Sequence, residues 1–109
     1  MSRFVVVLDA GASKTLLRGQ CPGRAAPIER RGPGANPNRT GLDESAAVLV
    51  TLIESALQEC AAVDRLSVCA GVAGAGRPQE QTRLTDALRT ALSKAGRLVD
   101  VEVVHDALI

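Results

Sequence analysis

The stretch FVVVLDAGASKT, residues 4–15, decides the fold that we predict for this chain. Its first part is apolar and β-branched, which is typical of a strand buried on both faces, and Asp9 follows at the carboxyl end of that strand. Ligands bind at this edge in open α/β sheets. Residues 10–13 are small, so their backbone N–H groups can approach a phosphate, while Asp9 can hold Mg²⁺. The alternative is an ordinary tight turn, because Asp and Gly suit turn geometry.

The composition is typical of one small globular domain. The chain has 109 residues, of which 46% are hydrophobic and 23% are charged. Its net charge is +1 and Phe4 is its only aromatic residue, so it lacks the charge excess and the stacking platform of nucleic-acid-binding proteins. No apolar segment is long enough to span a membrane. We therefore expect a cytoplasmic protein that binds small molecules, with no nucleic acid and no membrane as partner.

The cysteines predict neither cross-links nor a metal site. Cys21, Cys60 and Cys69 are an odd number without a C-x-x-C spacing, so a disulfide framework, a zinc site or an iron–sulfur site is not expected. Cys60 and Cys69 lie in apolar runs, which is typical of small core residues.

The first third of the chain is predicted to form an antiparallel meander. After the strand over residues 4–8, a second strand is expected over residues 15–20 and a third over residues 25–31. The residues between them, 21–24, contain the proline and glycine of a turn. Pro27 marks the third strand as an edge strand or an irregular one.

Residues 32–41, GPGANPNRTG, combine glycines, prolines and asparagines without an apolar period, so we predict a loop. A flexible linker between domains is the alternative, but it would leave too few residues before it to fold alone. A structured loop over the sheet edge is therefore the favoured interpretation.

Two helices are predicted in the rest of the chain, each with one apolar stripe. The first covers residues 42–62 and has Asp43 and Glu44 in its first turn, where negative charge favours the helix dipole. The second begins at Pro78 and stops at Gly96. The stripe residues recur at helical spacing and are Leu49, Ile53, Ala56, Leu57 and Cys60 in the first helix and Leu84, Leu88, Ala91, Leu92 and Ala95 in the second.

Strands over residues 65–70 and 99–104 complete the predicted fold. A second small-residue turn, GVAGAG at 71–76, leaves the same sheet edge as the opening turn if the two preceding strands are parallel. The element order is then β-β-β-α-β-α-β, and its two strand–helix–strand crossovers require a parallel part of the sheet. We predict an α/β fold with a mixed five-stranded sheet, the layout of a ribonuclease H-like (actin-like ATPase) domain. This layout places Asp9 and Asp106 at the carboxyl ends of neighbouring strands.

Two common phosphate-binding motifs are absent from the sequence. A P-loop requires Gly directly before its Lys, whereas Lys14 follows Ser13. The dinucleotide fingerprint requires the order G-x-G-x-x-G, whereas Gly71, Gly74 and Gly76 have the reverse spacing. Neither a P-loop NTPase nor a Rossmann dehydrogenase is supported.

Four short motifs together resemble a known family. They are DAGASKT at 9–15, GPGANPNRTG at 32–41, AGVAGAGRP at 70–78 and HDA at 105–107. In order and spacing they resemble the first lobe of the BadF/BadG/BcrA/BcrD-type ATPases, which include the N-acetylglucosamine kinases and lie within the actin-like, sugar-kinase and Hsp70 superfamily. The resemblance implies that residues 1–109 are a single N-terminal lobe and that the second lobe is absent.

The resemblance also implies a role for each matching residue. Asp9 corresponds to the metal carboxylate that acts through Mg²⁺ on the phosphates of ATP. Asp106 corresponds to the catalytic carboxylate, which contacts the substrate and accepts the proton of the sugar 6-hydroxyl. The implied cofactors are therefore ATP and Mg²⁺, and the implied substrate is an amino sugar. The other matches are Gly11, Ala12, Ser13 and Lys14 at the ATP phosphates, Gly34 and Asn36 at the sugar, and Gly74 and Gly76 beside the sugar and the γ-phosphate.

The chain departs from the family pattern at Ala10 and Ala12, which are glycines in the family, and at Ser13, which is threonine there. Added methyl groups are unfavourable wherever the turn needs positive φ. The alternatives are an ATPase activator of a radical acyl-CoA dehydratase or reductase, a ribonuclease H-like nuclease that uses Asp9 and Asp106 on two metals, and a non-catalytic truncated binding module. Without a second lobe, apolar surface near the last strand is expected to favour a homodimer.

Overall fold

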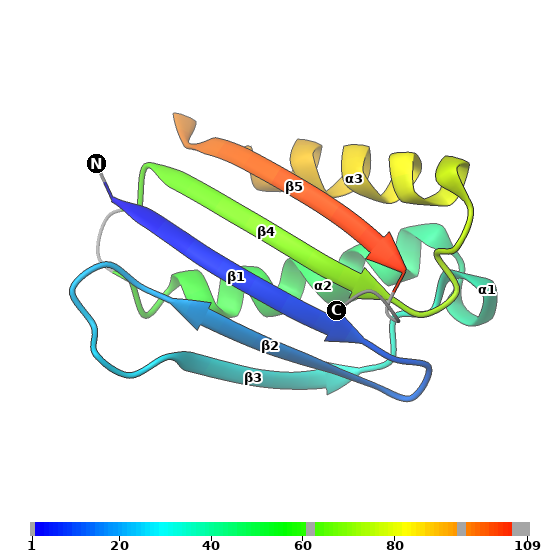
Figure 1. Ribbon diagram of the computed structural model, residues 1–109, viewed down its shortest axis with the longest axis horizontal. Coiled ribbons are helices and arrows are strands. Elements are labelled where there is room, and N and C mark those ends of the chain that lie inside the picture. Colours follow the sequence, from blue (N-terminus) through cyan, green and yellow to red (C-terminus); the bar gives the residue numbers. More distant parts are fainter. Residues whose placement is uncertain (1, 61–62, 94–95, 106–109) are drawn as a thin grey trace.

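A computed structural model describes residues 2–60, 63–93 and 96–105, which form one mixed sheet and its helices (Figure 1). The elements are β1 (Arg3–Ala10), β2 (Lys14–Gln20), β3 (Ile28–Pro33), α1 (Pro37–Thr40), α2 (Leu42–Leu57), β4 (Arg65–Val72), α3 (Pro78–Leu92) and β5 (Leu98–His105). The predicted α/β class is confirmed. The observed element order contains one helix more than predicted, the short α1.

The strands lie in the order β3-β2-β1-β4-β5 across the sheet. The antiparallel meander is confirmed, because β1 pairs with β2 and β2 with β3 in antiparallel fashion. The crossovers are confirmed as well, since β4 is parallel to both β1 and β5. The expectation that Asp9 and Asp106 follow neighbouring strands is wrong for β1 and β5, because β4 lies between them. Asp106 itself is outside the described residues.

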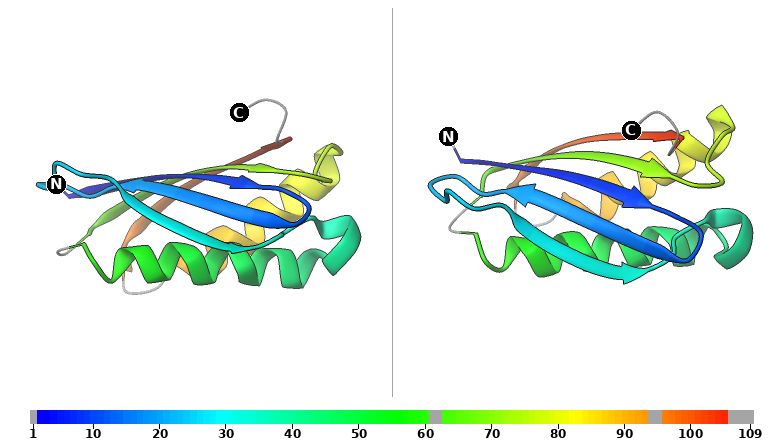
Figure 2. Two further views of the ribbon diagram at one scale, coloured as in Figure 1. Left: turned by 90° about the horizontal axis from the view of Figure 1, so that it is seen from below. Right: turned by 60° about the horizontal axis from the view of Figure 1, so that its bottom comes forward.

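Both long helices cover the same face of the sheet (Figure 2). The prediction that β1 is buried on both faces is therefore wrong. Its burial alternates strictly: Phe4, Val6 and Leu8 are fully buried under the helices, whereas Val5 and Val7 are 43% and 41% exposed on the other face. Four apolar residues in a row are compatible with a strand that is covered on both faces and with one that is covered on a single face. The sequence alone therefore could not show that the helices cover only one face of β1.

The helices pack on the sheet through the predicted stripes. Leu49, Ile53 and Ala56 of α2 are fully buried, but α2 ends at Leu57, earlier than predicted. In α3 the buried residues are Leu84, Leu88 and Leu92, and Pro78 occupies the first turn as expected. Among the described residues, no helix is long and apolar enough to cross a membrane.

The loop predicted over residues 32–41 is partly regular structure. Gly32 and Pro33 extend β3, which begins at Ile28 rather than Ala25 and is an edge strand as predicted. α1 follows because Asn36 caps it and Pro37 starts it with a suitable φ.

The expectation that the cysteines form no cross-link is wrong. Cys21 and Cys60 form a disulfide, with their Cα atoms 5.7 Å apart and 39 residues apart in sequence. Cys21 follows β2 and Cys60 follows α2, and the return of α2 along the sheet brings the two together. Cys69 is the free cysteine of the described chain and is half-buried in β4.

Candidate functional site

Three segments of small residues meet beside the carboxyl ends of β1 and β4, where the sequence predicted ligand binding (Figure 1). They are the turn 11–13, the segment 34–36 and the turn 73–76. Backbone hydrogen bonds hold them together: Ala35 N donates to Gly11 O at 3.2 Å, which joins the first two segments, and Ala73 N donates to Ala10 O at 2.8 Å, which joins the third to the end of β1. We call these segments the glycine-turn cluster.

Two glycines make the close approach within this cluster sterically feasible. A Cβ at Gly34 would overlap the backbone oxygen of Ala12, so the first two segments touch main chain to main chain. Gly74 has φ +85°, and a Cβ there would overlap the side-chain oxygen of Asn36. Both glycines were predicted site residues, and the structure brings both into the cluster.

Asn36 has a structural role in this arrangement. Its Oδ1 accepts a hydrogen bond from the backbone N of Asn38 at 2.9 Å and so caps α1. Asn38 in turn donates from Nδ2 to the carbonyl of Gly74 at 3.3 Å, which links α1 to the turn after β4. Asn38 was not predicted as a site residue, although the Asn-Pro-Asn sequence is a recognisable helix start.

Three further side chains hold the cluster and were missed by the sequence analysis. Thr15 is fully buried, and its Oγ1 donates to the carbonyl of Pro33 at 2.7 Å. Ser45 is fully buried in α2 and donates to the carbonyl of Ala35 at 2.5 Å. Gln81 donates from Nε2 to the carbonyl of Ala75 at 2.9 Å. The sequence did hold a signal for these residues: each is polar at a position that the pattern of apolar residues predicts to be buried. Buried hydroxyl groups need hydrogen-bond partners.

The predicted phosphate turn is a tight β-hairpin. Gly11 N donates to the carbonyl of Lys14 at 2.8 Å, which closes the connection between β1 and β2. Ala12, Ser13 and Lys14 are exposed, so the turn projects into solvent at the end of the sheet. The alternative interpretation of this stretch, a tight turn, is therefore confirmed, and phosphate binding by the turn stays a prediction.

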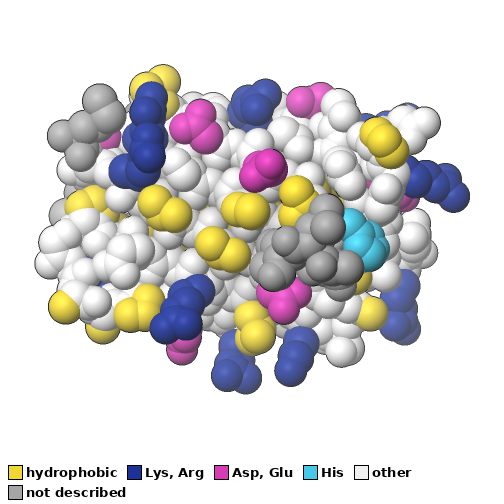
Figure 3. Space-filling view, in the orientation of Figure 1, with side chains coloured by type: hydrophobic (Ala, Val, Ile, Leu, Met, Phe, Trp, Pro, Cys, Tyr) yellow, Lys and Arg dark blue, Asp and Glu magenta, His cyan; other side chains and the backbone are white. Residues whose placement is uncertain are grey.

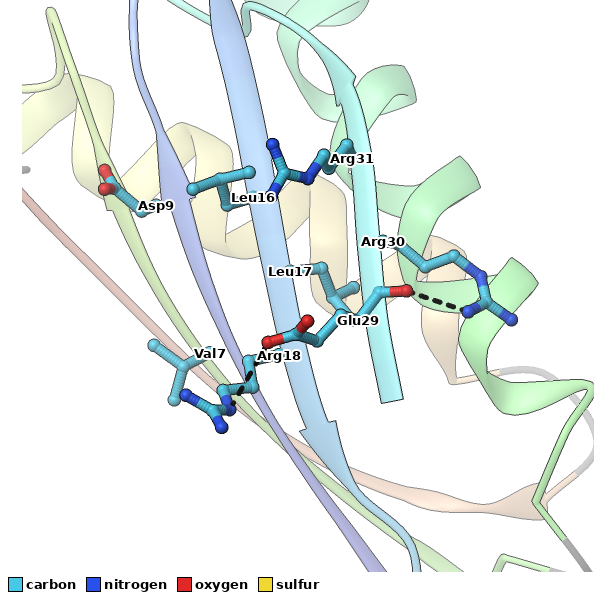
Figure 4. Close-up of a pocket in the computed structure, with 8 residues that line it drawn as sticks. All are labelled: Val7, Asp9, Leu16, Leu17, Arg18, Glu29, Arg30 and Arg31. Atoms are coloured by element: carbon cyan, nitrogen blue, oxygen red, sulfur yellow. Dashed lines mark hydrogen bonds and ion pairs between the residues drawn. The ribbon is translucent and has the colours of Figure 1, made fainter. Parts of the chain in front are cut away.

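Asp9 lies near the end of β1, on the face that the helices leave uncovered. In register, Asp9 is opposite Leu16 of β2, and Leu16 is opposite Arg31 of β3. Figure 4 shows this row, with Asp9 and Arg31 on either side of Leu16. The row crosses a shallow groove of about 240 Å³. Its lining residues are Val7, Asp9, Leu16, Leu17, Arg18, Glu29, Arg30 and Arg31.

The end of β5 also reaches the cluster. A Cβ at Gly76 would lie 3.5 Å from Cδ2 of His105, which places the last described residue beside the turn 73–76. The catalytic role predicted for Asp106 falls on a residue outside the described range. Within that range, His, Cys, Asp and Glu side chains form no group of three or more that could hold a metal, so Asp9 belongs to no such group there.

Comparisons with known proteins identify the fold. No family model matches the chain, and no curated protein does. Among solved structures, the chain is similar to a "Putative N-acetylglucosamine Kinase from Chromobacterium violaceum", with a TM-score of 0.65 and 16% identity over 94% of this chain and 35% of that one. It is also similar to a foamy viral protease-reverse transcriptase solved with double-stranded DNA, with a TM-score of 0.54 and 15% identity over 93% of this chain and 20% of that one.

The sequence identities are low, so these similarities establish the architecture alone. The chain has the mixed five-stranded sheet of the ribonuclease H-like and actin-like ATPase folds, as predicted. It spans 35% of the length of the Chromobacterium violaceum protein.

Proposed function

We propose that this chain is the phosphate- and sugar-binding lobe of an ATP-dependent sugar kinase of the N-acetylglucosamine kinase type, within the BadF/BadG/BcrA/BcrD-type family. The observation that supports this proposal is the glycine-turn cluster, in which segments far apart in sequence meet at one sheet edge. Phosphoryl transfer depends mostly on positioning and charge neutralisation, and an edge of accessible backbone N–H groups beside a carboxylate suits both needs.

The phosphate part of the site consists of the hairpin turn and Asp9. Ala12 and Ser13 offer backbone donors, and the exposed ammonium group of Lys14 offers positive charge; the N–H of Gly11 closes the hairpin on Lys14, so Gly11 contributes by shaping the turn. A single carboxylate fits Mg²⁺, which retains waters and takes its other oxygens from the nucleotide phosphates. When bound, Mg²⁺ would neutralise phosphate charge, and the side chain of Asp9 would hold it.

The sugar part consists of Gly34, Asn36, Gly74 and Gly76. Because Oδ1 of Asn36 caps α1, the side chain is held in one orientation and its amide nitrogen is the group left to donate to a sugar hydroxyl. Asp106 would accept the proton of the attacking hydroxyl, a role carried over from the family resemblance.

Binding of Mg·ATP, measured by isothermal titration calorimetry on the 109-residue chain, tests the phosphate site. We expect Mg²⁺-dependent binding that Asp9→Asn removes. Asp86→Asn, an exposed carboxylate of α3 outside the cluster, is the matched control and should leave binding unchanged. Binding that is absent in the parent, or equal in both variants, contradicts the proposal.

Turnover tests the assignment of the reaction. We expect no phosphoryl transfer to N-acetylglucosamine by the chain alone, because it spans about a third of its kinase-like neighbour. In a longer form that contains this segment, Asp106→Asn should abolish turnover and retain nucleotide binding. Retained turnover in that variant would rule out Asp106 as the base.

Two alternatives receive less support from the described residues. An ATPase activator of a radical enzyme needs cysteines free to hold a cluster, whereas Cys21 and Cys60 are paired in a disulfide. A two-metal nuclease needs several converging carboxylates, and Asp9 has no such partners within the described range.

A further inference from the structure

The sheet ends in two edge strands, β3 and β5, whose free edges are protected to different degrees. β3 has Pro27 directly before it, Pro33 at its end, and the charged residues Arg30 and Arg31 between them, and these features discourage pairing with another strand. β5 has the sequence LVDVEVVH, with four valines and neither Pro nor Lys. An edge strand of this length and composition is a template on which a further strand can form.

The ladder with β4 shows which backbone groups of β5 face its free edge. Leu98 is in register with Arg65, and its N–H donates to the carbonyl of Asp64 at 2.9 Å. In a parallel ladder alternate residues bond to the same neighbour, so the residues at the even positions of β5 face β4. The N–H and C=O groups of the odd positions point to the open side, where no strand of the described chain pairs with β5. These positions include Val99, Val101 and Val103.

A groove of about 320 Å³ lies between β5 and α3, the helix that packs beside it (Figure 1). Thr82 is exposed in this groove, and Thr85 and Val101 are half-buried. Because side chains of a strand alternate between the two faces of a sheet, a strand added to β5 would direct every second side chain toward α3 and into the groove. The lining side chains that matter here are Thr82, Thr85 and Asp86 of α3 and Val101, Glu102 and Val103 of β5.

The charges beside this edge are acidic. β5 presents Asp100 and Glu102 on the face of the sheet that the helices leave uncovered, and Figure 3 shows carboxylates over the part of that face where β5 runs. Burial raises the pKa of the Cys69 thiol on β4, and the neighbouring Glu102 carboxylate raises it further. Asp86 adds a carboxylate from α3, and the described lining of the groove contains no Lys or Arg. Arg89 lies one helical turn beyond Asp86, outside this lining.

These carboxylates argue against a second copy of β5 as the added strand. Antiparallel pairing of two β5 strands about Val101 would put Asp100 of each chain opposite Glu102 of the other, and the neighbouring registers would put each carboxylate opposite its own counterpart. Like charges directly opposite each other are destabilising. A strand with cations at alternate positions would instead meet both carboxylates. Its intervening side chains would lie beside Val101 and Thr85, which suits β-branched residues.

We propose that β5 binds an extended peptide segment of a partner protein as a sixth strand, and that this segment alternates Lys or Arg with Val, Ile or Thr. Main-chain hydrogen bonds to Val99, Val101 and Val103 supply affinity, and the carboxylates and the groove supply specificity. Since strand residues pair one to one, the segment that these contacts span is about five residues long. β4 separates the site from Asp9 on β1, so the inference does not depend on the proposed function.

Fluorescence polarisation of a labelled Lys-Val-Lys-Val-Lys-Val peptide tests the proposal. The parent should bind it at least about tenfold more tightly than a Glu-Val-Glu-Val-Glu-Val peptide, because attraction to the carboxylates becomes repulsion. A Lys-Lys-Lys-Val-Val-Val peptide has the same composition but cannot place all its cations on one face of a strand, so it should bind more weakly. Equal binding of the two orders would show that net charge alone attracts the peptide and would overturn the proposal.

Two kinds of variant separate the main-chain contacts from the charges. Val101→Pro removes an N–H that points away from β4, so it should weaken peptide binding at least about tenfold and leave the ladder intact. Asp100→Lys with Glu102→Lys should weaken binding of the Lys-Val peptide and strengthen that of the Glu-Val peptide. Glu54→Lys, the same charge reversal at an exposed position of α2, is the matched control and should bind like the parent. Thermal unfolding should show that each variant is folded.

Hydrogen exchange followed by NMR locates the bound peptide. The Lys-Val peptide should slow exchange at the amides of Val99, Val101 and Val103, whereas the amides of Asp100 and Glu102, which already bond to β4, should change little.

Several results would overturn the proposal. They are a parent that does not bind the Lys-Val peptide, variants at Val101 or at the two carboxylates that bind it as the parent does, and protection that falls on strands other than β5. Self-association of the parent that Val101→Pro abolishes would also overturn it, because a second copy would then be the strand that β5 accepts.

Discussion

The two ends of the sheet are held together in different ways. At one end the glycine-turn cluster packs closely because two glycines lack a side chain: Gly34 lies against the main chain of Ala12, and Gly74 lies against the side chain of Asn36. At the other, which we call the disulfide end, side chains make the connections: Cys21 is bonded to Cys60, and Glu59 pairs with Arg24 and Arg30 of the hairpin between β2 and β3. The first end depends on the absence of side chains and the second on their chemistry. An accessible main chain suits ligand binding, whereas cross-links suit stability.

The largest effect is expected at the disulfide end. Cys21→Ser with Cys60→Ser should lower the free energy of unfolding by about 4 kcal/mol, because the bond closes a loop of 39 residues in the unfolded chain. Chemical denaturation measures the change. Cys69→Ser is the matched control and should cost much less, and reduction of the parent should reproduce the double variant.

The next effect is expected at the glycine-turn cluster. Gly34→Ala should cost about 3 kcal/mol, because its methyl group would overlap the main chain of Ala12, which cannot move like a side chain. Gly23→Ala is the control: it has φ +77° and no neighbour within 4 Å, so only the backbone strain of about 1 kcal/mol applies. If both variants lose the same free energy of unfolding, the close approach of Gly34 to Ala12 adds nothing to the cost of the substitution.

Gly74→Ala should cost about 2 kcal/mol, from positive φ and from overlap with the Asn36 side chain. Removal of the Asn36 side chain should relieve the overlap but not the strain of positive φ. In a double-mutant cycle, Gly74→Ala should therefore cost less free energy of unfolding in the Asn36→Gly background than in the parent. Thermal unfolding of the four proteins measures it. Additive losses would contradict the contact that the structure shows.

The smallest effect is expected from the ion pairs of the disulfide end. Arg24 pairs with Glu59 at 3.2 Å, and Arg30 pairs with the same carboxylate and donates from Nε to Ser55 at 3.0 Å. Because Glu59 is partly exposed, Glu59→Gln should cost less than about 1 kcal/mol, and the loss should shrink in high salt. A loss as large as that from the disulfide would reverse our ranking of the two kinds of connection.

The cross-link also bears on where the protein acts. Disulfides are typical of oxidising compartments and rare in the reducing cytoplasm. The bond between Cys21 and Cys60 therefore does not favour the cytoplasmic setting expected from the composition, which stays a prediction.

Part of the candidate site was predictable because its signals are local. The hairpin turn that follows Asp9 is one continuous stretch of sequence, and the turn that contains Gly74 is another. Because β1 and β4 are parallel, the direction of the strands alone puts both turns at the same edge of the sheet. Asn38, Thr15 and Ser45 were missed because their hydrogen-bond partners lie 10 to 36 residues away in the sequence. The sequence indicates a helix start at Asn38 and polar side chains at buried positions for Thr15 and Ser45, but only the tertiary contacts identify their partners.

By itself the sequence determined the five strands, the two long helices and the α/β class, because apolar periodicity, prolines and glycines act over a few residues. Only the tertiary structure decided that both long helices share one face, that Cys21 meets Cys60 and that Asn36 caps a helix beside Gly74. The reason is physical. Burial on one side or both, and the meeting of residues far apart in the chain, depend on how elements pack, and the same local pattern is compatible with more than one packing.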